Sequence, residues 1–479
     1  METPVNYDVP TPQPPKKLSI KERYSTTIKV AIVGILTLLL LIPLGMIRSL
    51  IYERMETKRS TVSEITSKWS GEQILTGPCI VIPYVQELVQ KDKQELVRKN
   101  LLLFPEELSV IADAKAEKRK RAIYDVTVYR SDVIFSGKFN MSELAKTGIK
   151  PEQMYLDEAR VIIGISDLKG IREGVVLHLG DDQLNFESGI PVDNLYSGSS
   201  IPTKDIYYLE RNQPITSPSV STGIFGAGLN LKLDSTALTG ATQETIPFTI
   251  KLYLNGSEGF YITPIGKTTT AQLKSDWATP SFGGGFLPES HEVTKEGFTA
   301  QWKVIDLNRS FGQTVNAENE TAINQMESSV FGVKFIQSVD QYQQNIRSVK
   351  YAILIILLTF VIVFFVEVMK DKMVNPFQYL LVGLALVLFY SLLLSLSEVW
   401  GFNLAYFVAA TMTTALIILH MSSILQNRKQ GMFIGALLAF LYLFVFTLIQ
   451  MESYALLVGN IVLFCILAVI MYYSKKLKI

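Results

Sequence analysis

The feature that most constrains this chain is the segregation of its apolar residues into long runs. The first run, residues 30–46, contains no charged residue and is interrupted only by Pro43. Five more runs follow one another from position 351 to the end of the chain. Each is about 20 residues long, which is the length that a helix needs to cross a hydrocarbon core of about 30 Å. The five C-terminal runs are residues 351–368, 379–396, 404–425, 432–449 and 455–473.

The first run could belong to a cleaved signal peptide or to an uncleaved anchor. It begins well inside the chain, and no small-x-small cleavage site follows it. Arg48, Glu53 and Arg54 follow instead. We therefore expect an uncleaved anchor and six transmembrane helices, one N-terminal and five C-terminal, embedded in a lipid bilayer.

The charges of the short connections between the runs predict how the chain is oriented. Lysine and arginine occur in alternate connections and are missing from residues 398–403 and 451–454. Basic connections remain in the cytoplasm, so both chain termini are expected there and the long segment between the first two runs is expected outside. The basic residues concerned are Lys370, Lys372, Arg428, Lys429, Lys475, Lys476 and Lys478.

The predicted organisation therefore has four parts. Residues 1–28 form a basic cytoplasmic tail, and residues 29–51 form the first transmembrane helix. Residues 52–347 form a large extracytoplasmic domain with flanking juxtamembrane helices, and residues 348–479 form a C-terminal membrane domain of five helices with a cytoplasmic C-terminus.

The large extracytoplasmic segment is predicted to consist mostly of strands. Its apolar residues alternate with polar ones or are β-branched, and Gly, Pro, Asn and Ser cluster between the runs. Many short strands with frequent turns are typical of a sandwich, so the fold class is a membrane protein of α+β type with a mostly-β sandwich domain. The predicted strands are residues 80–85, 125–129, 132–139, 160–165, 174–179, 228–233, 246–254, 298–305 and 331–335.

Helices are expected on both sides of this β region. Met55, Val62 and Ile65 have helical spacing within 53–69, and this helix continues the first transmembrane run. On the other side, Asp340 offers an acidic N-cap, and no Pro or Gly occurs from there to Pro376. We therefore expect one helix of about 30 residues to run from outside into the membrane.

Composition excludes several classes of function. A net charge of +1 argues against a nucleic-acid binder, which carries a basic excess. Three His and two Cys, none of them clustered, argue against a metal site, and we expect no cofactor. The segment 281–285 (Ser-Phe-Gly-Gly-Gly), together with His291, leaves open a hydrolase in which glycine N–H groups hold an oxyanion. The alternative, which we prefer, is a turn that requires glycine.

Two further groups of charged residues allow more than one interpretation. The basic run 115–121 is expected at a solvated hairpin tip, with contact to anionic lipid or to an envelope polymer as the alternative. Glu367, Glu398, His420 and Asn460 are polar residues within the predicted spans. Glu367 and Glu398 lie close to span ends rather than at midpoints, so they give limited support to a transporter.

Four blocks of sequence resemble the CreD family of bacterial inner-membrane proteins, and together they extend over nearly the whole chain. They begin near Glu53 and continue in order into the C-terminal helices. The sequence departs from the family pattern at Asn375 and at Val399-Trp400, where the family commonly has histidine, which puts any role of a histidine there in doubt. The motif residues are Trp69, Gly77, Pro78, Pro83, Tyr84, Trp277, Pro280, Phe282, Pro288, Trp302, Asp340, Tyr342, Arg347, Lys350, Tyr351, Glu367, Pro376, Gln378, Tyr379 and Glu398.

The resemblance implies a multi-pass protein of the bacterial inner membrane that serves cell-envelope integrity and the response to stress, including β-lactam tolerance. We treat the motif residues as structural candidates and expect a non-enzymatic protein. Its extracytoplasmic domain would bind or sense an envelope component or another membrane protein. A transporter or translocation component and an extracytoplasmic hydrolase are the alternatives.

Overall fold

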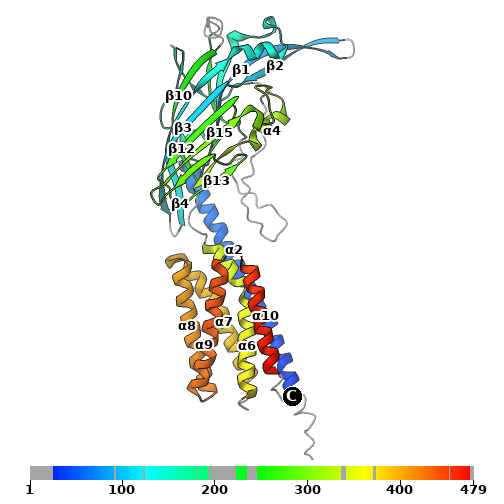
Figure 1. Ribbon diagram of the computed structural model, residues 1–479, viewed down its shortest axis with the longest axis vertical. Coiled ribbons are helices and arrows are strands. Elements are labelled where there is room, and N and C mark those ends of the chain that lie inside the picture. The colour runs from blue at the N-terminus through cyan, green and yellow to red at the C-terminus, as the bar shows by residue number, and fades with distance from the viewer. Residues whose placement is uncertain are drawn as a thin grey trace, which may run out of the picture. The chain divides into compact units, whose positions relative to one another are not determined.

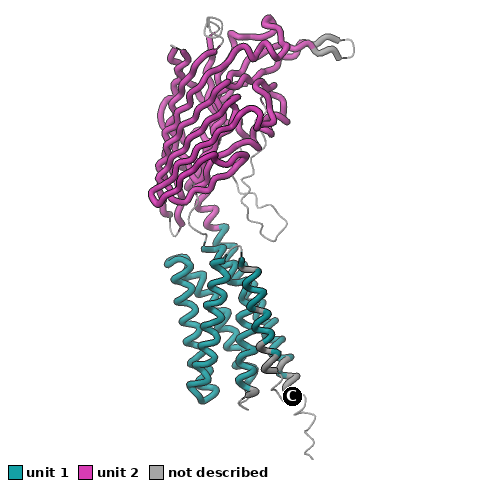
Figure 2. The backbone as a smooth tube through the Cα atoms, viewed as in Figure 1, with its two compact units in different colours: residues 1–56, 339–479 teal, residues 57–338 magenta. Residues whose placement is uncertain are grey.

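The computed structural model separates the chain into two compact units, residues 1–56 with 339–479 and residues 57–338 (Figure 2). Asp340 and the basic residues Lys370, Lys372, Lys475, Lys476 and Lys478 lie outside the described residues, as does most of the predicted basic tail. The structure describes residues 25–90, 93–121, 124–180, 182–192, 195, 223–234, 245–335, 341–369, 374–451 and 454–474.

The first unit is helical (Figure 1). Four of its described helices, α2, α7, α8 and α9, are long and apolar enough to cross a membrane, and the bent pair α5–α6 would make a fifth span. In α10 the described apolar stretch is Leu457–Ala468, so the count of six spans stays a prediction. The helices are α2 (Ser25–Trp69, of which residues 57–69 fall in the second unit), α5 (Gln341–Lys350), α6 (Ala352–Met369), α7 (Pro376–Trp400), α8 (Phe402–Ile424), α9 (Arg428–Gln450) and α10 (Ala455–Ser474).

The expected continuous helix after Asp340 is wrong in one respect, because α5 and α6 meet at a bend of 42°. At the bend the backbone tightens into bonds between residues three apart. Tyr351 N donates to Ser348 O at 3.1 Å, and Leu354 N donates to Tyr351 O at 3.1 Å. Such 3₁₀-type turns change the direction of a helix without Pro or Gly, and the sequence contains neither residue at this point.

The second unit contains two large sheets. The first sheet has nine strands among the described residues. Its strand order is β13-β17-β11-β1-β5-β9-β8, and off this path β2 pairs with both β1 and β16. The β1–β11 pair is parallel, and all the other pairs given for this sheet are antiparallel. The strands are β1 (Gln73–Gln90), β2 (Lys93–Leu103), β5 (Arg160–Ile165), β8 (Glu187–Ser188), β9 (Gly228–Lys232), β11 (Gly259–Ile262), β13 (Pro280–Gly284), β16 (Thr314–Asn316) and β17 (Phe331–Phe335).

The second sheet has eight strands over the same described ranges, in the order β14-β15-β12-β3-β4-β10-β6-β7. A long hairpin of β3 and β4 forms its centre, and the remaining strands extend it on both sides (Figure 1). The strands are β3 (Glu107–Arg121), β4 (Tyr124–Asn140), β6 (Val176–Leu179), β7 (Asp182–Asn185), β10 (Thr245–Ser257), β12 (Thr268–Ser275), β14 (Ser290–Val293) and β15 (Phe298–Ile305).

One hydrophobic cluster contains side chains from both sheets. Phe260 of β11 and Phe135 of β4 both belong to it and are fully buried. Alternation explains the pattern, because every second residue of β12 is buried while the residues between them are half-buried or exposed. The shared cluster supports a sandwich, although the face-to-face arrangement of the two sheets stays a prediction.

Each predicted strand is confirmed as a strand, although β6 begins two residues after the start of 174–179 and β9 ends one residue before the end of 228–233. The segments 160–165 and 298–305 coincide with β5 and β15, whereas 125–129 and 132–139 belong to a single strand, β4. The preferred turn at 281–285 is wrong, because residues up to Gly284 form the strand β13, paired with β17. Gly284 has a φ of +99°, and a Cβ there would lie 2.1 Å from Val330 O. Close approach of two strands therefore accounts for this glycine.

Short helical segments fill the connections of the β unit. The helix α4 (Glu320–Ser328) begins at Asn319, whose side chain accepts a hydrogen bond from Ala322 N at 3.1 Å. Four of the five 3₁₀ turns lie between β4 and β6, and the fifth follows β15. These turns are η1 (Met141–Thr147), η2 (Pro151–Gln153), η3 (Leu156–Glu158), η4 (Leu168–Gly170) and η5 (Asp306–Asn308).

Candidate functional sites

The helical unit contains a polar network around Glu367, near the end of α6. This side chain is only 5% exposed, and its Oε1 lies 2.7 Å from Lys29 Nζ of α2. Its Oε2 accepts a hydrogen bond from the Tyr379 hydroxyl at 2.8 Å, and Oε1 also accepts one from Val374 N at 3.2 Å. The carboxylate thus receives a cation, a hydroxyl and a backbone N–H, as a buried charge requires.

The start of α7 positions two of the donors to Glu367, the Tyr379 hydroxyl and Val374 N. Asn375 is the N-cap, and its side chain accepts a hydrogen bond from Phe377 N at 3.0 Å. The Gln378 side chain accepts one from Asn375 N at 3.0 Å, and Pro376 occupies the first helical turn, where its missing N–H costs nothing. The motif residues Pro376, Gln378 and Tyr379 therefore belong to the same small assembly as Glu367.

A second motif pair lies where α5 meets the end of α7. The Tyr342 hydroxyl donates to Glu398 Oε1 at 3.0 Å. Next to it, Asn345 Nδ2 donates to Ser397 Oγ at 2.9 Å, and both of these side chains are fully buried. The remaining motif residues of this region are Arg347 and Lys350 in the last turn of α5, and Tyr351 at the bend.

Aromatic motif residues meet in the β unit. Phe282 of β13 makes edge contacts with Phe298 and Trp302 of β15, with ring centroids 5.7 and 6.0 Å apart. Trp277 makes an edge contact with Phe335 of β17 at 6.5 Å. Pro280 begins β13, and Pro288 lies in the connection from β13 to β14. Since Trp277 and Trp302 are at most 7% exposed, this cluster forms part of the core rather than a binding surface.

The hydrolase arrangement at Ser281 and His291 is not assembled. The His291 ring packs on Phe282, with centroids 5.1 Å apart. Ser281 and Phe282 are consecutive strand residues, so their side chains point to opposite faces of the sheet. The ring contact therefore keeps His291 on the side of the sheet away from the Ser281 hydroxyl, and a nucleophile needs its base within hydrogen-bond reach.

Metal and thiol chemistry receive no support from the described ranges, which contain no group of three or more His, Cys, Asp or Glu suited to a metal ion. Cys79 is fully buried in the β unit, and burial raises the pKa of its thiol well above the usual range. A thiol of that kind is a small packed side chain rather than a nucleophile.

The basic run 115–121 forms the end of β3 in the long β3–β4 hairpin. Arg119 stacks on the motif residue Trp69, with its guanidinium carbon 3.8 Å from the ring centroid, and Arg130 lies 5.8 Å from the same ring. The Lys118 ammonium lies 5.4 Å from the Trp277 ring centroid. Part of the run is thus used in cation–π contacts within the unit, which the expectation of a solvated tip did not include.

The first motif block begins in α2, and its residues from Gly77 to Tyr84 lie on β1. Gly77 and Pro78 are joined by a cis peptide bond, and a Cβ on Gly77 would lie 3.0 Å from Ile163 Cα. Further along the strand, Tyr155 N donates to Pro83 O at 2.8 Å, and the Tyr84 hydroxyl accepts a hydrogen bond from Asn316 Nδ2 at 3.2 Å.

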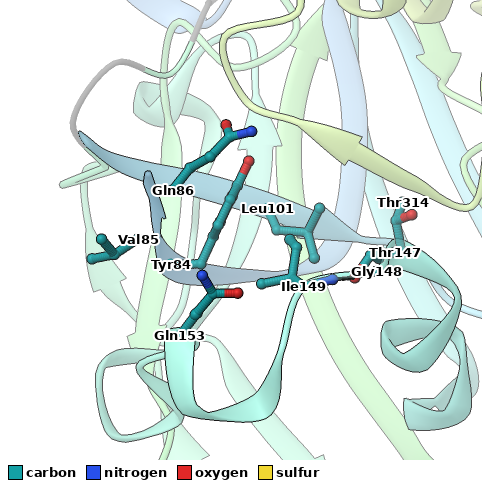
Figure 3. Close-up of a pocket in the computed structure, with 9 residues that line it drawn as sticks. All are labelled: Tyr84, Val85, Gln86, Leu101, Thr147, Gly148, Ile149, Gln153 and Thr314. Atoms are coloured by element: carbon teal, nitrogen blue, oxygen red, sulfur yellow. Dashed lines mark hydrogen bonds between the residues drawn. The ribbon is translucent and has the colours of Figure 1, made fainter. Parts of the chain in front are cut away.

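Tyr84 lines a cavity of about 390 Å³ (Figure 3). This volume lies within the range of about 300–1,000 Å³ that is usual for small-molecule sites. Sequence reasoning identified only Tyr84 here, because the lining comes from chain segments with no shared motif. The lining residues are Tyr84, Val85, Gln86, Leu101, Thr147, Gly148, Ile149, Gln153 and Thr314.

Comparison with known proteins agrees with the resemblance seen in the motifs. A family model described as the inner membrane protein CreD matches residues 25–479. The inner membrane protein CreD of Escherichia coli strain K12 is 31% identical over 445 residues, which cover 92% of this chain and 90% of that protein. This chain therefore belongs to the CreD family of inner-membrane proteins.

Proposed function

We propose that this protein maintains the integrity of the bacterial cell envelope without catalysing a reaction. Its β unit lies outside the cytoplasm, packs as a sandwich, and binds or senses an envelope component. The observation that carries this proposal is the insertion of a large β unit, residues 57–338, between apolar helices of a CreD-family chain. A unit of this size, held by one core and containing a cavity, is suited to recognition.

The orientation follows from the charges of the connections. Basic residues fall in alternate connections, so six spans would leave both termini in the cytoplasm and the β unit in the periplasm. Single-cysteine labelling tests this arrangement in intact cells. A Cys465→Ser background removes the exposed native thiol, while Cys79 is buried and unreactive.

In that background, an impermeant thiol reagent should label Asp182→Cys in cells whose outer membrane alone is opened. It should label Lys429→Cys only after the inner membrane is opened as well. Both positions are exposed in the structure, so a difference in labelling reports the membrane side rather than burial. Protection of Asp182→Cys until the inner membrane is opened would reject the proposed orientation.

The absence of catalysis has a separate test. His291→Ala and Ser281→Ala should leave the membrane level of the protein and survival under β-lactam or detergent stress unchanged, since the two side chains do not form a catalytic pair. Trp302→Ala should lower abundance, because loss of a buried Trp costs about 3–5 kcal/mol. A His291→Ala protein that accumulates normally but fails to protect cells would reject the non-enzymatic proposal and favour the hydrolase.

A transport or translocation role is the second candidate, and the buried Glu367 favours it. A carboxylate withdrawn from water inside an apolar helical unit is a common element of ion pathways. In this chain, however, the carboxylate lies near the end of α6, is paired with Lys29, and contacts the cap of α7. These contacts support an anchoring role for Glu367, and for that reason the envelope-integrity role takes precedence.

A further inference from the structure

The open cavity beside Tyr84 is lined by parts of the chain that are distant in sequence. Tyr84 and Gln86 are two residues apart on β1, so they share one face of the sheet. Leu101 pairs with Ile82 and Thr314 pairs with Leu103, which places them on that same face. The segment from η1 to η2 supplies the other wall, as the close-up shows (Figure 3).

The backbone edges around this cavity are already occupied, which excludes one mode of recognition. Pro83 has no N–H, and its carbonyl accepts a hydrogen bond from Tyr155 N. Tyr84 forms a bridge to Met154, and Leu101 of β2 pairs with Asn316 of β16. A peptide that adds as a strand needs a free edge, so the ligand must instead be recognised by side chains.

Hydrogen-bond donors remain available on those side chains. The Tyr84 oxygen accepts from Asn316, and among the described residues its own proton has no acceptor. Gln153 uses its Oε1 to accept from Lys150 N at 3.1 Å, which leaves its NH₂ group for a ligand. Gln86 also lines the cavity and is an exposed residue, so its NH₂ group can donate as well. Three residues can therefore donate to oxygen atoms of a ligand.

The lining is uncharged, although charged residues make up 19% of the chain. A tyrosine hydroxyl is protonated at neutral pH, and burial raises the pKa of Tyr84 further, so it remains a donor. Leu101 and Ile149 add apolar surface beside these donors. An uncharged site that combines apolar contact with several donors suits a neutral ligand rich in oxygen atoms.

We propose that this cavity binds one ring of a neutral saccharide. Tyr84, Gln86 and Gln153 donate to its hydroxyl or carbonyl oxygens, and the C–H groups of the ring lie against Leu101 and Ile149. The inference rests on the proposed function, because it names the chemical class of the envelope component that the β unit recognises.

Ligand-observed NMR on the full-length protein in nanodiscs tests the proposal. Two neutral disaccharides serve as probes, cellobiose and N,N′-diacetylchitobiose, which differ in whether they carry acetamido groups. We expect saturable binding of at least one disaccharide at concentrations of about 1 mM. Binding of cellobiose would identify hydroxyl oxygens as the acceptors, and binding of N,N′-diacetylchitobiose alone would identify the acetamido carbonyls. Binding of neither disaccharide, or binding only of the peptide acetyl-Ala-Ala-Ala-amide, overturns the proposal.

Variants then locate the site. Tyr84→Phe removes one donor and keeps the ring, and Gln86→Ala removes an exposed amide. Each should weaken binding about three- to tenfold, the loss expected for one hydrogen bond. The matched control is Tyr155→Phe, since Tyr155 is 41% exposed and lies outside the lining. Thermal unfolding of each variant shows that it is folded, and equal affinity of the wild type, Tyr84→Phe and Gln86→Ala overturns the assignment.

Failure of this inference can be distinguished from failure of the proposed function. If Asp182→Cys reports the periplasm but no saccharide binds, only the ligand class is rejected. If Asp182→Cys reports the cytoplasm, the proposed function is rejected whether or not the cavity binds sugar.

Discussion

The two glutamate–tyrosine pairs of the helical unit have the same chemistry but different surroundings. Glu367 is 5% exposed and receives Lys29, Tyr379 and Val374 N. Glu398 is half-buried and receives the Tyr342 hydroxyl, and among the described residues no cation pairs with it. The carboxylate withdrawn from water is thus accompanied by a counter-charge, whereas the one that water still reaches is held by a single hydroxyl.

The largest effect should come from neutralising the buried carboxylate. Glu367→Gln keeps the shape of the side chain but leaves Lys29 without its partner. We expect a loss of about 3–5 kcal/mol in the free energy of unfolding, measured by denaturant titration in detergent. The control Glu398→Gln should lose no more than about 1 kcal/mol, because a partly exposed charge is worth little. Equal losses at the two positions would show that burial does not distinguish the pairs.

The two tyrosines give a smaller test of the same difference. Tyr379→Phe removes one of the donors to a buried charge and should cost about 1.5–3 kcal/mol. Tyr342→Phe removes the donor to Glu398, where water can take its place, and should cost about 0.5–1.5 kcal/mol. The same unfolding titration ranks the two variants, and a larger loss for Tyr342→Phe would reverse the comparison.

The smallest effect concerns the cap that supports the Glu367 network. Asn375→Ala removes the N-cap of α7 and loosens the backbone next to Val374, which donates to Glu367. Asn427 caps α9 by accepting from Lys429 N at 3.0 Å, so Asn427→Ala is a matched control. A lost cap costs about 1 kcal/mol, and we expect Asn375→Ala to exceed its control by a few tenths of that value. Identical melting temperatures for the two variants would show that the N-cap of α7 does not support the Glu367 network.

Much of the β unit could be predicted because its strands alternate. Phe298, Ala300, Trp302 and Val304 are buried while their neighbours are not, so residues 298–305 were recognisable as a strand. The strand β13 was missed because its glycines carry no alternating pattern, and only its pairing with β17 makes it a strand. The bend at Tyr351 was missed for a related reason, since no Pro or Gly marks it.

Several residues of the candidate sites could be predicted from the sequence, but the contacts between them could not. Glu367 and Tyr379 were both motif positions. They are 12 residues apart in sequence, and the end of α6 and the N-cap of α7 lie between them. Lys29 lies 338 residues from Glu367, and no local pattern indicates such a contact. In the same way, Tyr84 was a motif residue, whereas Gln153 and Thr314 reach its cavity only through the folding of separate segments.

The parallel pairing of β1 with β11 affects the order in which the chain can be assembled during synthesis. β1 begins at Gln73, but its parallel partner β11 ends only at Ile262. The other neighbour of β11, β17, ends at Phe335. At about 5–20 residues per second, the ribosome needs roughly ten seconds to a minute to supply the intervening chain. During that interval the edge of β1 at residues 73–75 waits for β11, whereas residues 80–90 of the same strand can pair at once with β2. Until β11 is made, this short edge is open to mispairing, and chaperone protection would matter there.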